Sequence, residues 1–270
     1  HVVFTIPNEL NILCLMDPKF MYKALFTISA ETIKELSKDK KYLGAKIGFT
    51  SVLHTWGQNL SLHPHIHMIV PGGGIDSNGK WKNSKKKFFL PVKVVSKLFK
   101  GKFLSYTKKN FDQRKIKDKE QFQEIINSCY SKDWVVYTKK PMKSAKHVVK
   151  YLGRYTHRIA ISNARIKKYE DNKVTFSYKD YSDHNQIKEM TLDDTEFFRR
   201  YMMHVLPPNF MKIRHYGFLG NRNKEERIKA VRTATNTKNP GPLLIDYEQI
   251  ISDILKRDVS ICIKCGQKRH

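Results

Sequence analysis

The sequence predicts an α+β fold in which helices pack against a central antiparallel sheet. Segments rich in β-branched and aromatic residues lie at both ends of long amphipathic segments, a pattern that favours strands and helices in alternation. Neighbouring strand-like segments are joined by short connections, which favour antiparallel pairing. With 40% hydrophobic residues, a chain of 270 residues can also build a sizeable core.

The first part of the chain is expected to contribute three strands and one long helix. Residues 1–6 form an apolar strand. Asp17 caps a helix over residues 18–38, which has a proline in its first turn. Residues 46–55 make a second strand, and a short connection leads to a third over residues 62–70. These two strands are therefore expected to pair as antiparallel neighbours.

The rest of the chain is predicted to alternate between helices and short strands before a polar tail. The helices are expected at residues 94–110, 119–130, 144–156 and 193–206, with another basic helix after them. The strands are expected at residues 88–91, 134–138, 158–162, 173–181 and 186–192. The strand at 134–138 is apolar enough to be buried on both faces. From Thr233 the composition becomes polar, with Asn-Pro-Gly-Pro, which indicates a linker to a loosely held tail.

Positive charge is the dominant global feature of the chain. It carries 51 Lys and Arg against 25 Asp and Glu, a net charge of +26. Such an excess repels itself unless the partner is a polyanion, so nucleic acid is the expected partner. There is no apolar run of about 18 residues that would span a membrane, and no basic amphipathic helix with an aromatic face. A membrane is therefore not an expected partner.

The cysteines and the first residue indicate the cellular context. Cys14 and Cys129 stand alone in apolar patterns and are expected in the core, which suits a reducing cytosol. Cys262 and Cys265 have half of a zinc-knuckle spacing, which predicts an incomplete metal site. The start of the chain has no signal-like character, and His1 is not Met, so we expect a fragment of a longer protein.

Three histidines alternate with apolar residues or proline in the strand predicted at residues 62–70. Because successive side chains of a strand point to opposite faces, His63, His65 and His67 share one face. Two imidazoles two residues apart can bind one divalent metal ion from the same side. The alternative is a surface strand whose histidines only meet solvent. His54 lies near the end of the preceding strand, and the pattern does not decide which face it takes.

A second candidate site lies on the helix predicted at residues 144–156. His147, Tyr151 and Tyr155 recur every four residues and therefore line one side of that helix. The cations that recur beside them at the same interval are Lys146, Lys150, Arg154 and Arg158. A phenol beside positive charge is more easily deprotonated, so the tyrosines are candidate nucleophiles. An aromatic stripe at helical spacing more often belongs to a packed core, but the cations interleaved with these tyrosines favour a functional site.

The histidine strand and the tyrosine helix in combination resemble the HUH endonucleases, and the chain is similar to transposases of the IS91 family. The stretches that carry this resemblance are HVVFTIP at residues 1–7, LHTWGQNLSLHPHIHMIVPGGG at 53–74, YLGRYTHRIAISN at 151–163 and RHYGFLGNR at 214–222. The histidine block and the tyrosine block are specific together, whereas either alone would be weaker.

The resemblance implies an HUH-type sheet with the tyrosine helix packed over the histidine strand. It also implies a DNA transposase that nicks and rejoins single-stranded DNA through a 5′-phosphotyrosine, in rolling-circle transposition. By the matching motifs, Tyr151 and Tyr155 are the nucleophiles, and His65 and His67 are metal ligands.

Two imidazoles underfill a six-coordinate Mg²⁺ or Mn²⁺ ion, so a third protein ligand is expected. His147 is the first candidate for this ligand, and His63 is its substitute. Zn²⁺ would also fit a trio of imidazoles. The residues expected to contact DNA are Lys146, Lys150, Arg154, His157, Arg158, Arg214 and Arg222.

This interpretation divides the chain into three parts. Residues 1–165 are the nuclease domain, residues 166–235 a basic α+β extension packed on it, and residues 236–270 a polar tail with the incomplete Cys pair. The expected partner is single-stranded DNA at the ends of a mobile element and at its target, in a prokaryotic-type cytoplasm at the nucleoid. The rivals are a non-catalytic basic nucleic-acid-binding protein with structural histidines, and a zinc hydrolase that cleaves nucleic acid with water.

Overall fold

A computed structural model of the chain describes residues 1–84, 89–139, 148, 153, 160–239, 241, 246–263 and 265–268. The chain divides into two compact units, residues 1–235 and residues 236–270, and each is described by itself. The predicted α+β class is confirmed, because the larger unit contains a five-stranded antiparallel sheet together with several helices. Among the helices in the described part of the chain, none is long and apolar enough to cross a membrane.

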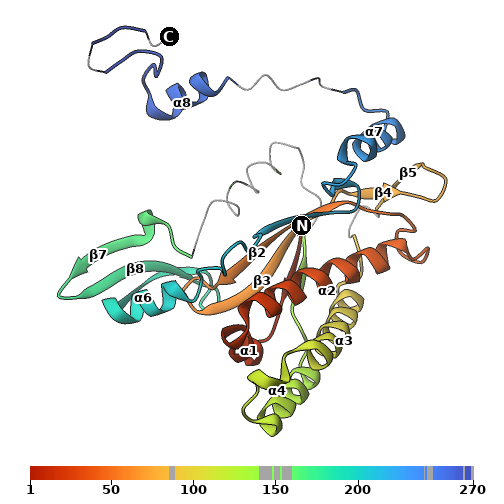
Figure 1. Ribbon diagram of the computed structural model, residues 1–270, viewed down its shortest axis with the longest axis horizontal. Coiled ribbons are helices and arrows are strands. Elements are labelled where there is room, and N and C mark those ends of the chain that lie inside the picture. Colours follow the sequence, from red (N-terminus) through yellow and green to blue (C-terminus); the bar gives the residue numbers. More distant parts are fainter. Residues whose placement is uncertain are drawn as a thin grey trace. The chain divides into compact units, whose positions relative to one another are not determined.

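The five-stranded sheet has the strand order β10-β2-β3-β1-β6, and all its neighbours pair antiparallel (Figure 1). The strands are β1 (Val2–Thr5), β2 (Phe49–Trp56), β3 (Leu62–Ile69), β6 (Val136–Thr138) and β10 (Ile213–Tyr216). The predicted antiparallel pairing of the second and third strands is confirmed. In that pair, His54 lies directly opposite His65 and Val52 lies opposite His67.

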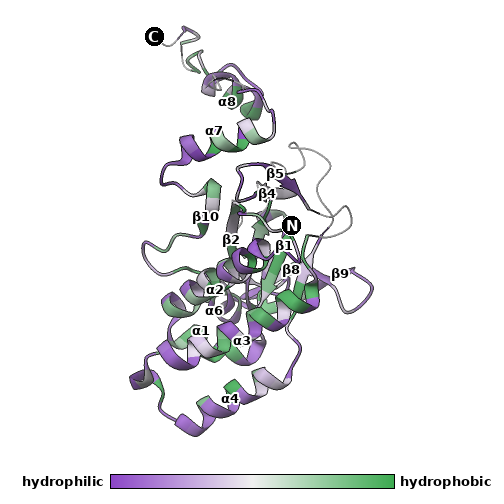
Figure 2. Ribbon diagram, turned by 90° about the vertical axis from the view of Figure 1, so that its right-hand side faces the viewer, coloured by the Kyte–Doolittle hydropathy of each residue, from purple (hydrophilic) through white to green (hydrophobic). Residues whose placement is uncertain are grey.

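Helices cover one face of this sheet. They are α1 (Asn11–Met16), α2 (Pro18–Lys38) and α3 (Val92–Asn110), and α4 (Lys119–Ser131) packs against α3. The predicted cap of α2 is confirmed, because the Asp17 side chain accepts a hydrogen bond from the Phe20 amide at 3.0 Å. The fully buried Phe4 and Ile66 belong to the core between sheet and helices, with Phe99 of α3 packed edge-on against Phe4. Figure 2 shows α4 with hydrophilic and hydrophobic residues mixed, as an amphipathic helix has them.

The opposite face of the sheet carries the histidines, and we call it the histidine face. Strand alternation sends Ile66 into the core and His65 and His67 to the other side. Because residues directly opposite each other in a pair share a face, His54 and Val3 also lie there. The histidine face is therefore built by the three central strands of the sheet.

A second, smaller sheet packs against one helix and forms a core of its own. Its strands are β7 (Ile166–Glu170), β8 (Lys173–Asp180) and β9 (Gln186–Asp193), and its helix is α6 (Asp194–Met202). Phe176 of β8 and Phe197 of α6 meet edge-on, with ring centroids 5.8 Å apart. The side chain of Leu60, from the connection between β2 and β3, is buried in this core.

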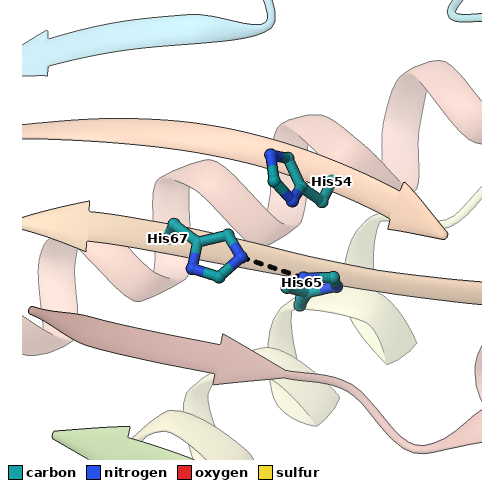
Figure 3. Close-up of side chains that lie close together, drawn as sticks. All are labelled: His54, His65 and His67. Carbon is teal, nitrogen blue, oxygen red and sulfur yellow. Dashed lines mark hydrogen bonds between the residues drawn. The ribbon is translucent and has the colours of Figure 1, made fainter. Parts of the chain in front are cut away.

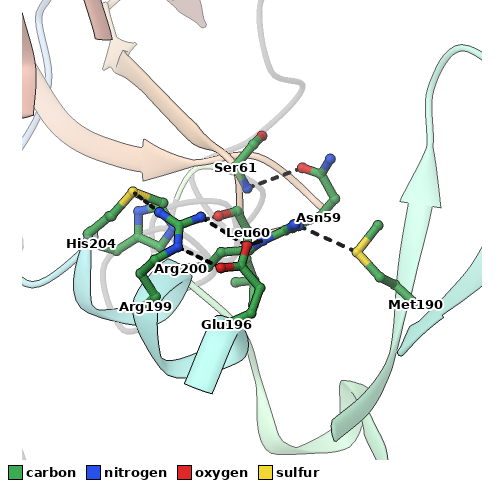
Figure 4. Close-up of polar contacts among 9 residues, drawn as sticks. Asn59, Leu60, Ser61, Met190, Glu196, Arg199, Arg200 and His204 are labelled. Atoms are coloured by element: carbon green, nitrogen blue, oxygen red, sulfur yellow. Dashed lines mark hydrogen bonds and ion pairs between the residues drawn. The ribbon is translucent and has the colours of Figure 1, made fainter. Parts of the chain in front are cut away.

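Side chains of α6 and of the turn after it hold the backbone of the connection between β2 and β3 (Figure 4). Arg200 donates to the carbonyl of Asn59 at 3.3 Å, and His204 Nε2 donates to the carbonyl of Leu60 at 3.1 Å. Arg165 donates to the carbonyl of Gln58. Leu60 itself has a φ of 62°, which a non-glycine residue adopts only where its surroundings favour it. The connection that sets the register of β2 against β3 is thus fixed from outside the main sheet.

The remaining elements are short. They are the hairpin strands β4 (Gly73–Ile75) and β5 (Trp81–Asn83), the 3-10 turns η1 (Asn8–Leu10), η2 (Gln113–Lys115), η3 (Asn163–Arg165) and η4 (Gly217–Leu219), and the helices α7 (Lys224–Ala234) and α8 (Tyr247–Leu255). In the smaller unit, the Cys262 amide donates to the carbonyl of Gln267 at 2.8 Å, and the Gly266 amide donates to the carbonyl of Cys262 at 2.9 Å. Metal binding by these cysteines stays a prediction.

Several predicted elements are wrong in detail. The segment at 134–138 is not buried on both faces, because β6 is the last strand beside β1 and leaves Val135 67% and Tyr137 50% exposed. Phe89 and Leu90 form a bend that leads into α3 rather than a strand. The helix predicted at 193–206 is α6, which ends at Met202.

Two predictions concern the stretch that precedes β7. The described end of the strand expected at 158–162 is irregular, and Ala160 has a φ of 51°, which is incompatible with a strand. The helix expected at 144–156 lies outside the described residues, apart from single positions within it.

Candidate metal centre

Three histidines meet on the histidine face, one from β2 and two from β3 (Figure 3). One ring nitrogen from each of His54, His65 and His67 lies within 4.8 Å of the others, and in the described part of the chain this is the one such group of possible metal ligands. The Nε2 atoms of His65 and His67 are 3.1 Å apart. The alternation predicted from the sequence therefore holds, since His65 and His67 do share a face.

The spacing of these nitrogens fits a single metal ion. Nitrogens bound to one ion at about 2.1 Å lie about 3.0 Å apart when adjacent at right angles and at most about 4.2 Å apart. The 3.1 Å between His65 and His67 matches the first value, and small ring rotations would bring the whole group within the second. An all-imidazole donor set suits Zn²⁺, Mn²⁺ and other divalent transition ions, with open positions left for water or a phosphate oxygen.

The electrostatics of the site favour the ligating form of the imidazoles. Burial, with a smaller contribution from charge repulsion by His54, lowers the pKa of His65 to about 3. Burial, with repulsion from His65 and then His54, lowers the pKa of His67 to about 2. Both rings are therefore neutral at pH 7, and a cation has no proton to displace from either lone pair.

The backbone of His63 orients the ring of His65. The Nδ1 atom of His65 is 2.7 Å from the carbonyl oxygen of His63. A carbonyl can only accept, so Nδ1 of the neutral His65 ring carries the proton and Nε2 keeps its lone pair for a metal. The His63 side chain is exposed, and its ring centroid is 5.2 Å from that of His65. His63 thus contributes to the site through its main chain.

His54 is the member of the cluster whose face the sequence did not decide. It is 5% exposed, and its ring stacks on Trp56 with centroids 4.5 Å apart and an interplanar angle of 18°. The β2–β3 register shifts between His54 and Trp56, which marks a β-bulge. The two rings of this i, i+2 pair pack together next to the metal ligands, and Lys212 Nζ lies 5.8 Å from the Trp56 ring centroid.

The tyrosine side of the predicted site is not described. Tyr151, Tyr155, His147, Lys146, Lys150, Arg154, His157 and Arg158 all lie outside the described residues. Their assignment as nucleophiles, third ligand and DNA contacts stays a prediction.

The two other cations expected to contact DNA differ in their surroundings. Arg214 of β10 lies opposite Ser51, on the helix-covered face, and its guanidinium carbon is 4.3 Å from the ring centroid of Phe26. This is a packing contact of the cation–π type. Arg222 is exposed ahead of α7. Contact with DNA stays a prediction for both.

A cavity of about 340 Å³ adjoins the histidine cluster. His1 links the two, because it lines the cavity and its ring bonds to His67 of the cluster. Its walls are mostly apolar, with Val70, Phe89 and Leu219 among them, and Lys139 contributes a cation. The sequence offered no signal for this cavity, since its lining comes from segments far apart along the chain.

Comparison with known proteins places the chain among transposases. The profile of a family described as "Putative transposase" (Y2_Tnp) matches residues 48–227. The chain is 40% identical over 281 residues to "Putative transposase y4qJ" of Sinorhizobium fredii, an alignment that covers 99% of this chain and 71% of that protein. It is 29% identical over 274 residues to "Transposase for insertion sequence element IS801" of Pseudomonas savastanoi pv. phaseolicola, covering 99% of this chain and 66% of that protein. No solved structure matches the chain.

Fold and site together define a basic α+β protein with a three-histidine cluster, suited to a metal ion, on the sheet face opposite the helices. The chain belongs to the IS91-type transposase family, as the match over residues 48–227 and the 40% identity show. The resemblance seen in the sequence motifs is thereby confirmed.

Proposed function

We propose that this chain nicks and rejoins single-stranded DNA through a 5′-phosphotyrosine, as the strand-transfer enzyme of rolling-circle transposition. The observation that carries the proposal is the cluster of His54, His65 and His67 on the histidine face of a member of a transposase family. A net charge of +26 supports a nucleic-acid substrate. The proposal includes an HUH-type arrangement, in which the helix with Tyr151 and Tyr155 packs over the histidine strand.

The proposed reaction begins with a tyrosine hydroxyl of the 151/155 pair. Its oxygen, after loss of the proton, attacks the scissile phosphorus, and the bond from phosphorus to the 3′-oxygen breaks. One strand end is left as a 5′-phosphotyrosine and the other as a free 3′-hydroxyl. A divalent ion held by the imidazoles would withdraw charge from the phosphate oxygens as phosphorus becomes five-coordinate.

Rejoining is the reverse of this step and needs no nucleotide. A 3′-hydroxyl attacks the phosphotyrosine, the bond between phosphorus and the tyrosine oxygen breaks, and the phenol regains a proton. Two tyrosines one helical turn apart allow one site to hold two strand ends in turn. Lys150 and Arg154, beside the tyrosines, are proposed to hold the neighbouring phosphates, with Lys146, His157, Arg158 and Arg222 along the strand.

The remaining predictions belong to the same proposal. Residues 1–165 would act as the nuclease domain and residues 166–235 as an extension that supports it. DNA at the ends of a mobile element and at the target would be the partner, at the nucleoid of a prokaryotic-type cell. The chain spans 71% and 66% of the two relatives, so end recognition by the whole protein is part of this proposal as well.

The proposal is tested with a labelled single-stranded oligonucleotide, the protein and Mn²⁺, followed by a denaturing gel. A slowly migrating protein–DNA adduct that disappears with a chelator is the expected result. Binding without any cleavage would favour a basic nucleic-acid-binding protein with structural histidines. Cleavage without an adduct would favour a hydrolase that uses water.

The identity of the third ligand can be decided by two matched substitutions. His54→Ala should lower the affinity for Mn²⁺ by about tenfold or more, because the cluster loses one of its three nitrogens. His147→Ala should leave that affinity nearly unchanged, and calorimetric titration of the purified variants measures both. A larger loss in His147→Ala than in His54→Ala would make His147 the third ligand.

The cavity beside the cluster is proposed to take a base next to the scissile phosphate. Its apolar walls suit the face of a base, and Lys139 suits a phosphate. A side chain at Gly72 would start in open space, with Ser84 Oγ as its nearest contact at 3.8 Å, and both residues line the cavity. Gly72→Phe should therefore fill the cavity without displacing the backbone.

For Gly72→Phe we expect the KM for a single-stranded oligonucleotide to rise about tenfold. This is roughly the affinity that is lost when one base can no longer stack in the cavity. Affinity for Mn²⁺ should not change, because the ligands are untouched. Gly101→Phe is the matched control. Gly101 lies on α3, away from the cavity lining, and a Cβ there meets no atom within 4 Å. An unchanged KM in Gly72→Phe would remove the cavity from the DNA path.

A further inference from the structure

The outer nitrogen of His67 meets a residue that the proposed reaction does not use. Its Nδ1 atom is 2.9 Å from Nε2 of His1, and the two rings stack with centroids 5.2 Å apart and an interplanar angle of 12°. His1 precedes β1 and, by strand alternation, takes the same face as Val3, which lies opposite His67. The two imidazoles are thus neighbours on the histidine face.

We infer that His1 is a positioning residue of the metal centre, which holds His67 in the orientation and tautomer that bind a metal ion. The inference rests on the proposed function, because it concerns the same three-histidine site. It adds a role for the first residue of the HVVFTIP stretch that neither charge nor spacing suggested.

The metal-facing atoms determine the tautomer of His67. If Nε2 of His65 and Nε2 of His67 both give lone pairs to one ion, the proton of neutral His67 must sit on Nδ1. That proton needs an acceptor, and Nε2 of His1 is within hydrogen-bond distance of it. His1 then accepts the Nδ1 proton of His67, just as the carbonyl of His63 accepts the Nδ1 proton of His65. The two ligands of β3 are held by equivalent contacts, one from a main chain and one from an imidazole.

His1 is itself anchored by the sheet. The amide of Lys139, at the end of β6, donates to the His1 carbonyl at 2.8 Å. The pairing of β1 with both β3 and β6 continues this contact along the strand. Because the backbone of His1 is held on the β6 side and its ring bonds to β3, the acceptor cannot drift from His67 without breaking the edge of the sheet. This rigidity is what a positioning contact requires.

The inference predicts which substitutions are tolerated at position 1. His1→Phe keeps an aromatic ring for stacking but has no acceptor for the Nδ1 proton of His67. His1→Gln loses the ring but offers a carbonyl oxygen as acceptor. The affinity for Mn²⁺ should fall by about 10- to 100-fold in His1→Phe, the usual effect of losing a second-shell partner, and recover in large part in His1→Gln.

The test measures Mn²⁺ affinity by calorimetric titration, thermal unfolding without metal, and nicking of a single-stranded oligonucleotide at limiting and saturating Mn²⁺. His215→Phe is the matched control, because His215 is also a histidine on the histidine face whose ring bonds to a neighbour, Thr50, at 2.9 Å. We expect His1→Phe to unfold at the same temperature as the native protein. It should lose nicking activity at limiting Mn²⁺ and regain it at saturating Mn²⁺. His215→Phe should bind Mn²⁺ as the native protein does.

Two outcomes would overturn the inference. Native Mn²⁺ affinity in His1→Phe would remove His1 from the metal centre, while the native protein still nicked DNA and the proposed function stood. An equal loss of affinity in His1→Phe and His1→Gln, with lowered thermal stability in both, would make His1 a packing residue only. Absence of Mn²⁺ binding by the native protein would instead reject the metal centre itself, and the role of His1 with it.

Discussion

Replacing Tyr151 and Tyr155 together by phenylalanine should abolish the covalent protein–DNA adduct while binding of single-stranded DNA persists. The change removes two oxygen atoms and leaves the aromatic rings, so stacking and packing are preserved and only the nucleophile is lost. Loss of a covalent nucleophile lowers turnover by at least about 10³-fold in enzymes where it has been measured by substitution. A denaturing gel measures the adduct, and a filter or mobility assay measures binding.

The matched control is Tyr169→Phe, since Tyr169 is a 63% exposed tyrosine on β7, outside the main sheet. It should form the adduct at the native rate. Each single substitution, Tyr151→Phe or Tyr155→Phe, should keep one nicking event and lose the second. An adduct that survives in the double variant would end the tyrosine mechanism and leave water as the nucleophile.

Replacing His65 and His67 together by alanine should lower both the Mn²⁺ affinity and the nicking rate by about 100-fold or more, because two of three ligands are lost. The fold should survive, since both rings lie on the face opposite the helical core. Calorimetric titration, nicking rates and thermal unfolding measure the three effects.

His63→Ala tests whether the His63 ring is itself a metal ligand or only a neighbour of the ligand His65. Its carbonyl, which holds His65, remains after the substitution, and only an exposed ring is removed. We therefore expect its Mn²⁺ affinity to stay near that of the native protein. A loss as large as that of the double variant would make the His63 ring a ligand, and undiminished nicking in the double variant would show that the cluster is not used.

Local rules in the sequence were enough for part of the site. A strand has a period of two residues, so the shared face of His65 and His67 follows from their spacing alone. The cap formed by Asp17 and the antiparallel pairing of β2 with β3 follow from similarly local signals, a capping residue before proline and a short connection.

His54 shows where such reasoning stops. Its place beside the other two histidines depends on the register of β2 against β3, which puts His54 directly opposite His65. The connection that sets the register is held by Arg165, Arg200 and His204, which follow it by more than 100 residues in the chain. No local pattern around His54 contains this information.

The wrong predictions have the same origin. The apolar run at 134–138 predicts a strand buried on both faces, but burial is decided by which strands lie beside it, and β6 pairs with β1 alone in the described sheet. Phe89 and Leu90 have strand-like side chains, yet they form a bend where Leu90 is buried and the chain enters α3. Side-chain type predicts whether a residue is buried better than it predicts the backbone that buries it.

By itself, the sequence determined the basic charge, the α+β class, the histidine pair of β3 and the family, because each is a matter of composition, short-range periodicity or motif. Only the tertiary structure decided that His54 joins that pair, that His1 bonds to His67 and that a cavity adjoins them. These depend on strand order and register, which arise from contacts between segments far apart in the chain. Periodicity assigns a side chain to a face of its own strand, but only pairing across the sheet determines which side chains meet there.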